Sequence, residues 1–141
     1  MTSIIFAQNC ERVRALSASL TSHGNQVLIL EAVQRLYTKL KVLEVDLLVI
    51  DATHAHDDLF SMLVNAEYTQ ANLTSIILEE GPNHHRANPL LEFKSVACVL
   101  NNRTPIDDVA AIAMHFKKVD AARSNVYAFP SQPQKLVRLG Q

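Results

Sequence analysis

The sequence predicts an α/β domain in which five parallel strands form one sheet with helices on both of its faces. Short, continuously apolar segments recur at residues 3–7, 26–30, 46–50, 75–78 and 96–100. Segments with the apolar spacing of amphipathic helices separate them. Strands that are apolar throughout are typical of parallel sheets covered on both faces. Right-handed crossovers between such strands give a three-layer, doubly wound sandwich.

The first three helices are predicted from apolar side chains that recur every three or four residues and so share one helical face. The first helix should end near His23 and Gly24, because glycine readily adopts the left-handed conformation that closes a helix. The apolar stripes are Val13, Leu16 and Leu20 in the first helix, Val33, Leu36, Tyr37 and Leu40 in the second, and Leu59, Met62, Leu63 and Ala66 in the third.

The fourth helix is predicted to be short and the fifth to be long. Pro82 and Pro89 leave room for only one or two turns near residues 90–94, since proline lacks an amide donor and clashes with the preceding turn. For the fifth helix, Thr104 is the expected N-cap and Pro105 the expected first residue. Asp107 and Asp108 then suit its positive end, and the predicted buried stripe is Val109, Ile112, Ala113, Phe116 and Val119.

The composition favours one globular domain over residues 1–123. The chain has 141 residues, of which 48% are apolar, and a formal net charge of −1 without a basic stripe, which argues against nucleic-acid contact. No apolar segment approaches the ~20 residues that cross a bilayer. We therefore expect a cytoplasmic protein without membrane insertion. Cys10 and Cys98 are too few for a disulfide framework and are predicted to be buried thiols. Residues 124–141, with two prolines and no periodicity, are predicted to be a linker or docked tail that leads to a further domain.

These features together resemble the receiver domain of two-component response regulators, the CheY-like family. The resemblance runs from about residue 4 to 118 and rests on the order of five βα units and on residues 45–51, an apolar strand that ends in Asp51. Residues 104–109 are similar to the family's entry into its last helix, and Asp58 occupies the place of a common loop aspartate. The resemblance implies a flavodoxin-like sheet with strand order 2-1-3-4-5 and makes Asp51 the equivalent of the phosphoacceptor.

The chain departs from the family at the positions that surround the acceptor. Gln8 and Asn9 stand where receivers carry two acidic residues that hold Mg²⁺, and this hard cation prefers carboxylate oxygens. Glu80 stands where the family has a phosphoryl-binding Ser or Thr, and Asn102 stands in place of its lysine. The switch aromatic falls at Val99. Phosphoryl transfer depends on positioning and on neutralisation of charge, so little of that machinery remains.

The candidate site residues have alternative interpretations. Asp51 is either a phosphoacceptor or a structural residue that caps the next segment. Glu79 and Glu80, with Asp51, could form a small cation site or be solvated. Arg103 could reach Asp51 or Glu80 and lock the pocket with a salt bridge.

Two histidine pairs add a possible metal site to these alternatives. His54 and His56, followed by two aspartates, have spacing that can bind zinc, but loop histidines are more often solvated. The same holds for residues 84–85.

The departures favour a non-enzymatic pseudo-receiver that acts by protein–protein contact and needs no cofactor. The family's usual output face, formed by its fourth helix, last strand and last helix, implies Leu91, Phe93, His115 and Lys118 as interface residues, with core packing as the alternative for the first two. The expected partner is another protein, a further domain of the same polypeptide, or a second copy. Similar domains precede ATPase domains in pilus-localising proteins of the TadZ/CpaE kind and output domains in unorthodox transcriptional regulators.

Two rival functions stay open. The first is a working phosphorelay receiver that is phosphorylated at Asp51, with Glu80 or Asp58 helping to hold Mg²⁺. The second is a small-molecule sensor, because Gln8, Asn9, Glu80 and Asn102 would form a polar pocket at the carboxyl ends of the strands, where doubly wound sheets bind ligands.

Overall fold

The chain folds into a five-stranded parallel sheet with the strand order β2-β1-β3-β4-β5, as the sequence predicted. The computed structural model describes the backbone of residues 1–81 and 89–126, with side chains through residue 117. The strands are β1 (Thr2–Phe6), β2 (Gln26–Leu30), β3 (Leu47–Asp51), β4 (Thr74–Glu79) and β5 (Val96–Asn101). Their bounds differ by at most one residue from the apolar segments of the sequence, because burial on both faces requires apolar side chains along the whole strand.

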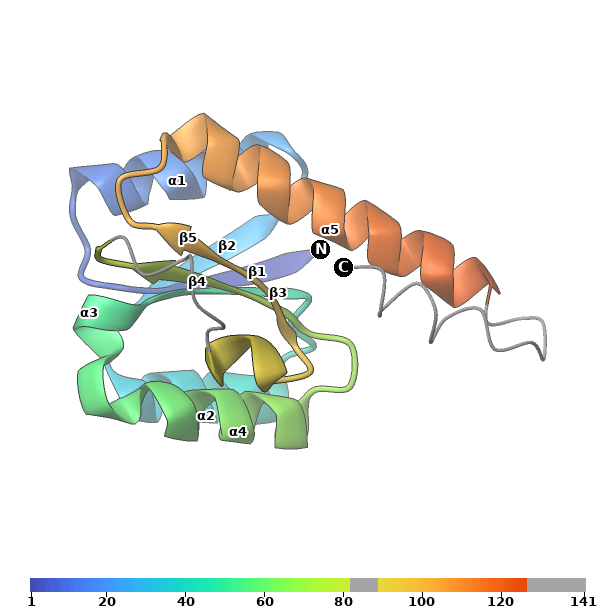
Figure 1. Ribbon diagram of the computed structural model, residues 1–141, viewed down its shortest axis with the longest axis horizontal. Coiled ribbons are helices and arrows are strands. Elements are labelled where there is room, and N and C mark those ends of the chain that lie inside the picture. The colour runs from blue at the N-terminus through green and yellow to red at the C-terminus, as the bar shows by residue number, and fades with distance from the viewer. Residues whose placement is uncertain (82–88, 127–141) are drawn as a thin grey trace.

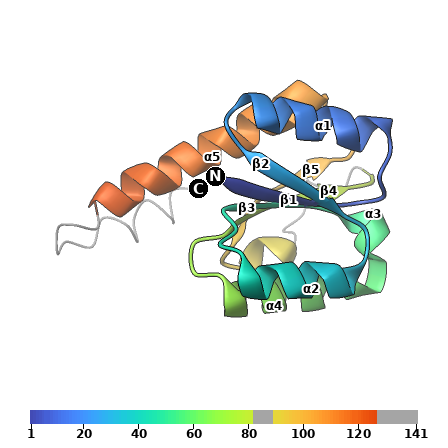
Figure 2. The same cartoon turned by 180° about the vertical axis from the view of Figure 1, so that it is seen from behind.

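Helices cover both faces of this sheet, so that the domain has three layers (Figure 1). One face carries α1 (Glu11–Ser22) and α5 (Ile106–Val126), and the other carries α2 (Val33–Val42) and α4 (Leu59–Thr69). The view from behind shows α2 beside α4 under the sheet (Figure 2). Each layer has its own apolar core: Ile4, Leu48 and Ile50 pack toward α2 and α4, and Val49 and Ile76 pack toward α1 and α5.

The predicted helical faces of α2 and α4 are confirmed. In α4 the buried residues are the four of the predicted stripe, and in α2 Leu36 and Leu40 are fully buried. Gly24 follows α1 with φ +90°, the left-handed conformation expected at the end of that helix. Local apolar periodicity was therefore sufficient to orient these helices on the sheet.

The segment between β3 and α4 contains two short turns that the sequence analysis did not predict. They are α3 (Ala52–Ala55) and the 3₁₀ turn η1 (His56–Asp58). His56 has φ +49°, a left-handed value that is uncommon for residues other than glycine. Before β5, the 3₁₀ turn η3 (Pro89–Glu92) agrees with the short helical segment predicted there, and residues 82–88 lie outside the described residues.

The start of α5 differs by one residue from the prediction. The carbonyl of Pro105 accepts the first hydrogen bonds of the helix, from the N–H groups of Asp108 and Val109, both at 3.0 Å. Pro105 is thus the cap residue rather than the first helical residue. The hydroxyl of Thr104, which was the predicted cap, donates to the carbonyl of Asn101 at 2.6 Å and closes the turn after β5 instead.

The buried face of α5 contains Val109 and Ala113 of the predicted stripe but is rotated relative to the rest of it. Ile112 and Phe116 are only half-buried, whereas Ala110 and Met114 are buried against the sheet. The side chain of Val119 lies outside the described residues. The helix continues through Val126, and the rest of the predicted linker, residues 127–141, is also outside them. Within the described part of the chain, no helix combines the length and the apolar character that a membrane span requires.

Candidate functional site at the carboxyl edge of the sheet

The candidate site lies where the parallel strands end, at the edge that carries Asp51. Asp51 is the last residue of β3 and is in register with Leu78 of β4. The next pair along the edge is Glu79 of β4 with Asn101 of β5. Because all five strands run in one direction, the residues that follow β1 and β2 reach the same edge.

The carboxylate of Asp51 caps the turn that follows it. Its Oδ1 atom accepts a hydrogen bond from the backbone N–H of Thr53 at 3.0 Å, and Asp51 is the N-cap residue of α3. The side chain is half-buried. A free helical N–H is satisfied in this way by a short acidic side chain. The geometry matches the structural alternative that the sequence analysis kept for Asp51.

The loop after β1 places an amide oxygen where the resemblance implies a metal-binding carboxylate, and an arginine of α1 binds this oxygen. Gln8 and Asn9 are both exposed, as their place after β1 implies. Asn9 Oδ1 accepts a hydrogen bond from Arg14 Nη1 at 3.1 Å, and the backbone N–H of Asn9 donates to Glu31 Oε2 at 2.7 Å. A guanidinium bound to this amide oxygen disfavours a second cation at the same atom. Among the described residues, no group of three or more Asp, Glu, His or Cys side chains is placed to hold a metal ion. The residues present therefore do not fit the Mg²⁺ that the family implies.

The ends of β4 and β5 place Glu79 and Asn101 at the edge, and the predicted pocket residues Glu80 and Asn102 directly follow them. The N–H of Asn102 donates to the carbonyl of Glu79 at 3.0 Å and extends the sheet past the last paired residues. Asn101 Oδ1 accepts from the N–H of Arg103 at 2.8 Å, so its side chain shapes the turn into α5. Glu80 is exposed and Asn102 is half-buried.

The salt bridge predicted for Arg103 is not formed. Its side chain is exposed, and among the described side chains neither Asp51 nor Glu80 forms an ion pair with it. A long exposed side chain gains little from holding one ion-pair geometry in water, which is the physical reason for this outcome.

One residue at this edge escaped the sequence analysis. Glu31, directly after β2, binds Asn9 through its carboxylate and His54 through its backbone carbonyl, which lies 2.8 Å from His54 Nε2. The ring of His54 also packs on Phe6, with 5.0 Å between ring centroids. These contacts hold His54 in the wall of the site. Its predicted zinc partner His56 is instead exposed beside Asp57, with 3.1 Å between His56 Nδ1 and Asp57 Oδ1. Residues 84–85 lie outside the described residues.

The two cysteines differ from the prediction that both are buried. Cys10 is exposed at the N-cap of α1. Cys98 lies inside β5 and is partly buried, and burial raises the pKa of its thiol to about 11. The Cys98 thiol is therefore uncharged at neutral pH.

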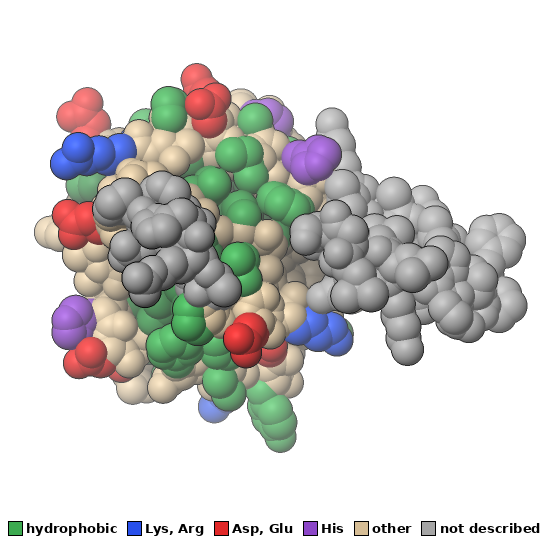
Figure 3. Space-filling model, viewed as in Figure 1, with side chains coloured by type: hydrophobic (Ala, Val, Ile, Leu, Met, Phe, Trp, Pro, Cys, Tyr) green, Lys and Arg blue, Asp and Glu red, His purple; other side chains and the backbone are tan. Residues whose placement is uncertain are grey.

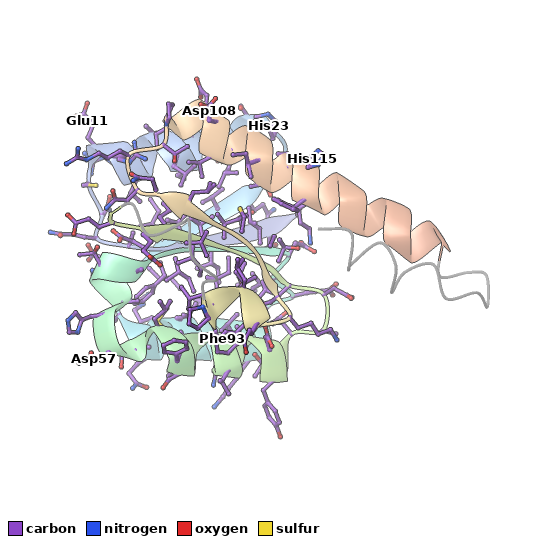
Figure 4. All side chains as sticks on the ribbon, in the orientation of Figure 1. Glu11, His23, Asp57, Phe93, Asp108 and His115 are labelled. Atoms are coloured by element: carbon purple, nitrogen blue, oxygen red, sulfur yellow. The ribbon has the colours of Figure 1, made fainter. Side chains whose placement is uncertain are left out.

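The predicted interface residues divide between the core and the surface. Phe93 packs against the core of the α2–α4 layer, with its ring centroid 5.7 Å from that of Phe60. Leu91 is 51% exposed and His115 is exposed on α5. Figure 4 shows Phe93 and His115 in opposite helical layers. The side chain of Lys118 lies outside the described residues. Leu91 and His115 are thus the accessible members of this set.

No family model matches the sequence, and no curated protein matches it either. Solved structures do match. The N-terminal domain of a response regulator/sensory box/GGDEF three-domain protein from Carboxydothermus hydrogenoformans has a TM-score of 0.72 and 11% identity, over 88% of this chain and 99% of that one. A CheY-like receiver domain from Methanospirillum hungatei JF-1 has a TM-score of 0.71 and 11% identity, over 86% and 97%.

A candidate CpaE2 pilus assembly protein from Sinorhizobium meliloti 1021 is also similar, with a TM-score of 0.64 and 15% identity over 83% of this chain and 99% of that one. The fold of this chain is therefore that of a response-regulator receiver domain, with the CheY-like strand order. At these identities the likeness establishes the fold, and the function has to be argued from the site.

Proposed function

We propose that this chain is a pseudo-receiver, a signalling module that uses the receiver fold for protein–protein contact without the standard phosphorylation of Asp51. The observation that carries this proposal is the hydrogen bond from Arg14 to Asn9. This bond commits the amide oxygen of Asn9, which stands at the place of a metal-binding carboxylate of the family, to an arginine of the chain.

The charges at the edge support the same proposal. A phosphoryl group on Asp51 would carry close to two negative charges and would need cations around it. Glu31, Glu79 and Glu80 instead place further carboxylates along this edge. Asn102 stands in place of the family's lysine and brings no charge. The Asp51 carboxylate already accepts a hydrogen bond from the backbone N–H of Thr53.

The partner surface that we propose is the face around η3, β5 and α5. Leu91 and His115 are exposed on its two sides, and β5 between them is an edge strand whose residues 97–100 are partly accessible. An apolar edge strand flanked by accessible side chains suits contact with another protein or with a further domain of the same polypeptide.

Intact-mass spectrometry tests the proposal. The chain is incubated with acetyl phosphate or phosphoramidate and Mg²⁺, beside an Asp51→Ala variant and a phosphorylatable receiver as the positive control. We expect no added phosphoryl mass on this chain while the positive control gains one. A gain that disappears in Asp51→Ala would overturn the proposal and favour a working phosphorelay receiver.

A further inference from the structure

The segment that follows Asp51 contributes little to the core of the domain. α3 is a single helical turn, which is too short to be stable without contacts to other elements. Ala55 is the buried residue of this turn, and no residue of η1 is buried. Figure 3 shows a histidine beside an acidic side chain on the surface at this corner, where Figure 4 labels Asp57. Specific contacts must therefore hold the segment in place.

The side chains of Asp51 and His54 make these contacts. The Asp51 carboxylate accepts the hydrogen bond of the Thr53 N–H at 3.0 Å. Nε2 of His54 lies 2.8 Å from the carbonyl oxygen of Glu31, and because a carbonyl only accepts, the imidazole N–H is the donor. The same ring packs on Phe6, which is buried. α3 thus links the end of β3 to the end of β2.

The end of α3 carries backbone strain. The turn ends at His56, whose φ of +49° and ψ of −122° are values that residues other than glycine rarely adopt. Unwinding of the turn releases this strain, so the strain partly offsets the contacts that favour the folded turn. A segment with few buried side chains and with backbone strain is typical of the regions that open locally while the rest of a domain stays folded.

Glu31 connects this segment to the loop after β1. Its backbone carbonyl accepts the hydrogen bond from His54, and its carboxylate accepts one from the N–H of Asn9 at 2.7 Å. Asn9 in turn accepts a hydrogen bond from Arg14 of α1. Loss of the His54 contact frees the backbone that positions the Glu31 carboxylate, so it weakens the bond to Asn9 as well. A continuous series of contacts therefore runs from Asp51 to α1.

We propose that residues 51–58 form a two-state latch that transmits the state of the Asp51 carboxylate to Asn9. In the closed state α3 is formed and its histidine is bound to Glu31. In the open state α3 is unwound, His56 is relaxed and the histidine is released. A cation or a covalent group on the carboxylate removes the cap of α3 and shifts the population toward the open state. The latch needs neither phosphorylation nor the η3–β5–α5 surface, so the inference goes beyond the proposed function.

Hydrogen exchange of backbone amides in the full chain, followed by NMR, tests the two states. The N–H of Thr53 donates to Asp51, that of His56 to the carbonyl of Ala52, and that of Leu59 to the carbonyl of His56, so these amides report on the latch. His56→Gly removes the strain of the closed state and should raise their protection from exchange by about fivefold. The matched control His56→Ala keeps the strain and should leave protection at the wild-type level. Equal protection in the two variants would overturn the proposal.

The amide of Asn9 tests the transmission, because it lies outside the latch. Asp51→Ala removes the cap and should speed exchange at Asn9 by about threefold, whereas Asp51→Asn keeps an acceptor oxygen and should leave it unchanged. In a His54→Ala background the link to Glu31 is absent, so Asp51→Ala should have no further effect. The same acceleration in both backgrounds, or none in either, would overturn the proposal.

Global unfolding is monitored in the same spectra. The amide of Val49, in the buried centre of β3, exchanges when the whole domain unfolds. We expect Asp51→Ala to change exchange at Asn9 by a larger factor than at Val49. Equal factors at the two amides would assign the effect to lost stability of the domain and would also overturn the proposal.

Discussion

The carboxylate of Asp51 and the backbone N–H of Thr53 are joined by a 3.0 Å hydrogen bond, so the residue in the place of a phosphoacceptor is also a cap. The cap begins α3, a single turn that connects β3 to α4. Covalent modification of this carboxylate would compete with the bond that orders the turn. The structural role of Asp51 can thus be measured independently of any phosphorylation.

The first prediction separates the cap from the charge of Asp51. Asp51→Ala removes the acceptor and should lower the free energy of unfolding by about 1 kcal/mol, whereas Asp51→Asn keeps an acceptor oxygen and should stay close to the wild type. Urea denaturation of the three proteins measures the difference. Equal stability of all three would show that the Thr53 bond contributes nothing to the fold.

The strands and the orientation of most helices followed from the sequence because their signals are local. Residues 26–30 were predicted with the bounds that β2 has, because four consecutive apolar residues follow Gln26 and the turn at Gly24 precedes them. The turns between β3 and α4 were missed because helices of three or four residues have no periodicity to detect. The rotation of α5 was also missed, since small residues such as Ala110 bury as readily as large ones.

The site was predicted less completely because its geometry depends on register between strands that are distant in sequence. Asp51 was placed correctly at the end of β3, whereas the pairing of Glu79 with Asn101 at the ends of β4 and β5 was not predicted. The contacts of Asn9 with Glu31 and Arg14 depend on side-chain directions across two loops. One signal could have found Glu31: every residue that directly follows a parallel strand reaches the same edge.

The second prediction concerns Lys117 of α5. Its ammonium group forms hydrogen bonds at the edge of the sheet opposite the candidate site. Its Nζ donates to the carbonyl of Asp46 at 2.9 Å, to that of Asn72 at 3.3 Å and to Thr74 Oγ1 at 3.4 Å. Lys117→Met keeps the apolar stem and removes these bonds, so it should lower the free energy of unfolding by about 1–3 kcal/mol.

Thermal and urea unfolding measure this change, with Lys94→Met as the control, since Lys94 is exposed on the surface. The control should change stability by about 0.5 kcal/mol or less. Equal free energies of unfolding for Lys117→Met and Lys94→Met would show that the hydrogen bonds of the Lys117 ammonium group contribute nothing to stability.

The third prediction concerns the pH dependence of stability. The Cys98 thiol has its pKa raised by burial from 9.0 to about 11. Above pH 9 the unfolded chain loses the proton of this thiol while the folded chain keeps it, so the unfolded state gains stability. The contribution of Cys98 is therefore fully present below pH 9 and is lost as the pH rises toward 11.

Urea midpoints measured across this window should fall less steeply for Cys98→Ala than for the wild type. Cys10→Ala is the matched control, because Cys10 is exposed. Identical slopes for Cys98→Ala and the wild type would mean that the thiol ionises alike in the folded and unfolded chains.

The fourth prediction is that His56→Gly stabilises the domain. His56 has φ +49° and ψ −122°, a conformation that glycine adopts freely and that costs other residues about 1–3 kcal/mol. Glycine adds entropy to the unfolded chain, which offsets roughly 0.5–1 kcal/mol of this gain. The side chain of His56 is exposed, so its loss removes no core contact. We therefore expect an increase of about 1 kcal/mol in the free energy of unfolding, measured by urea denaturation. His56→Ala keeps the strain and should show no increase, and a glycine variant that is no more stable than this alanine control would mean that the turn relaxes to ordinary backbone angles in solution.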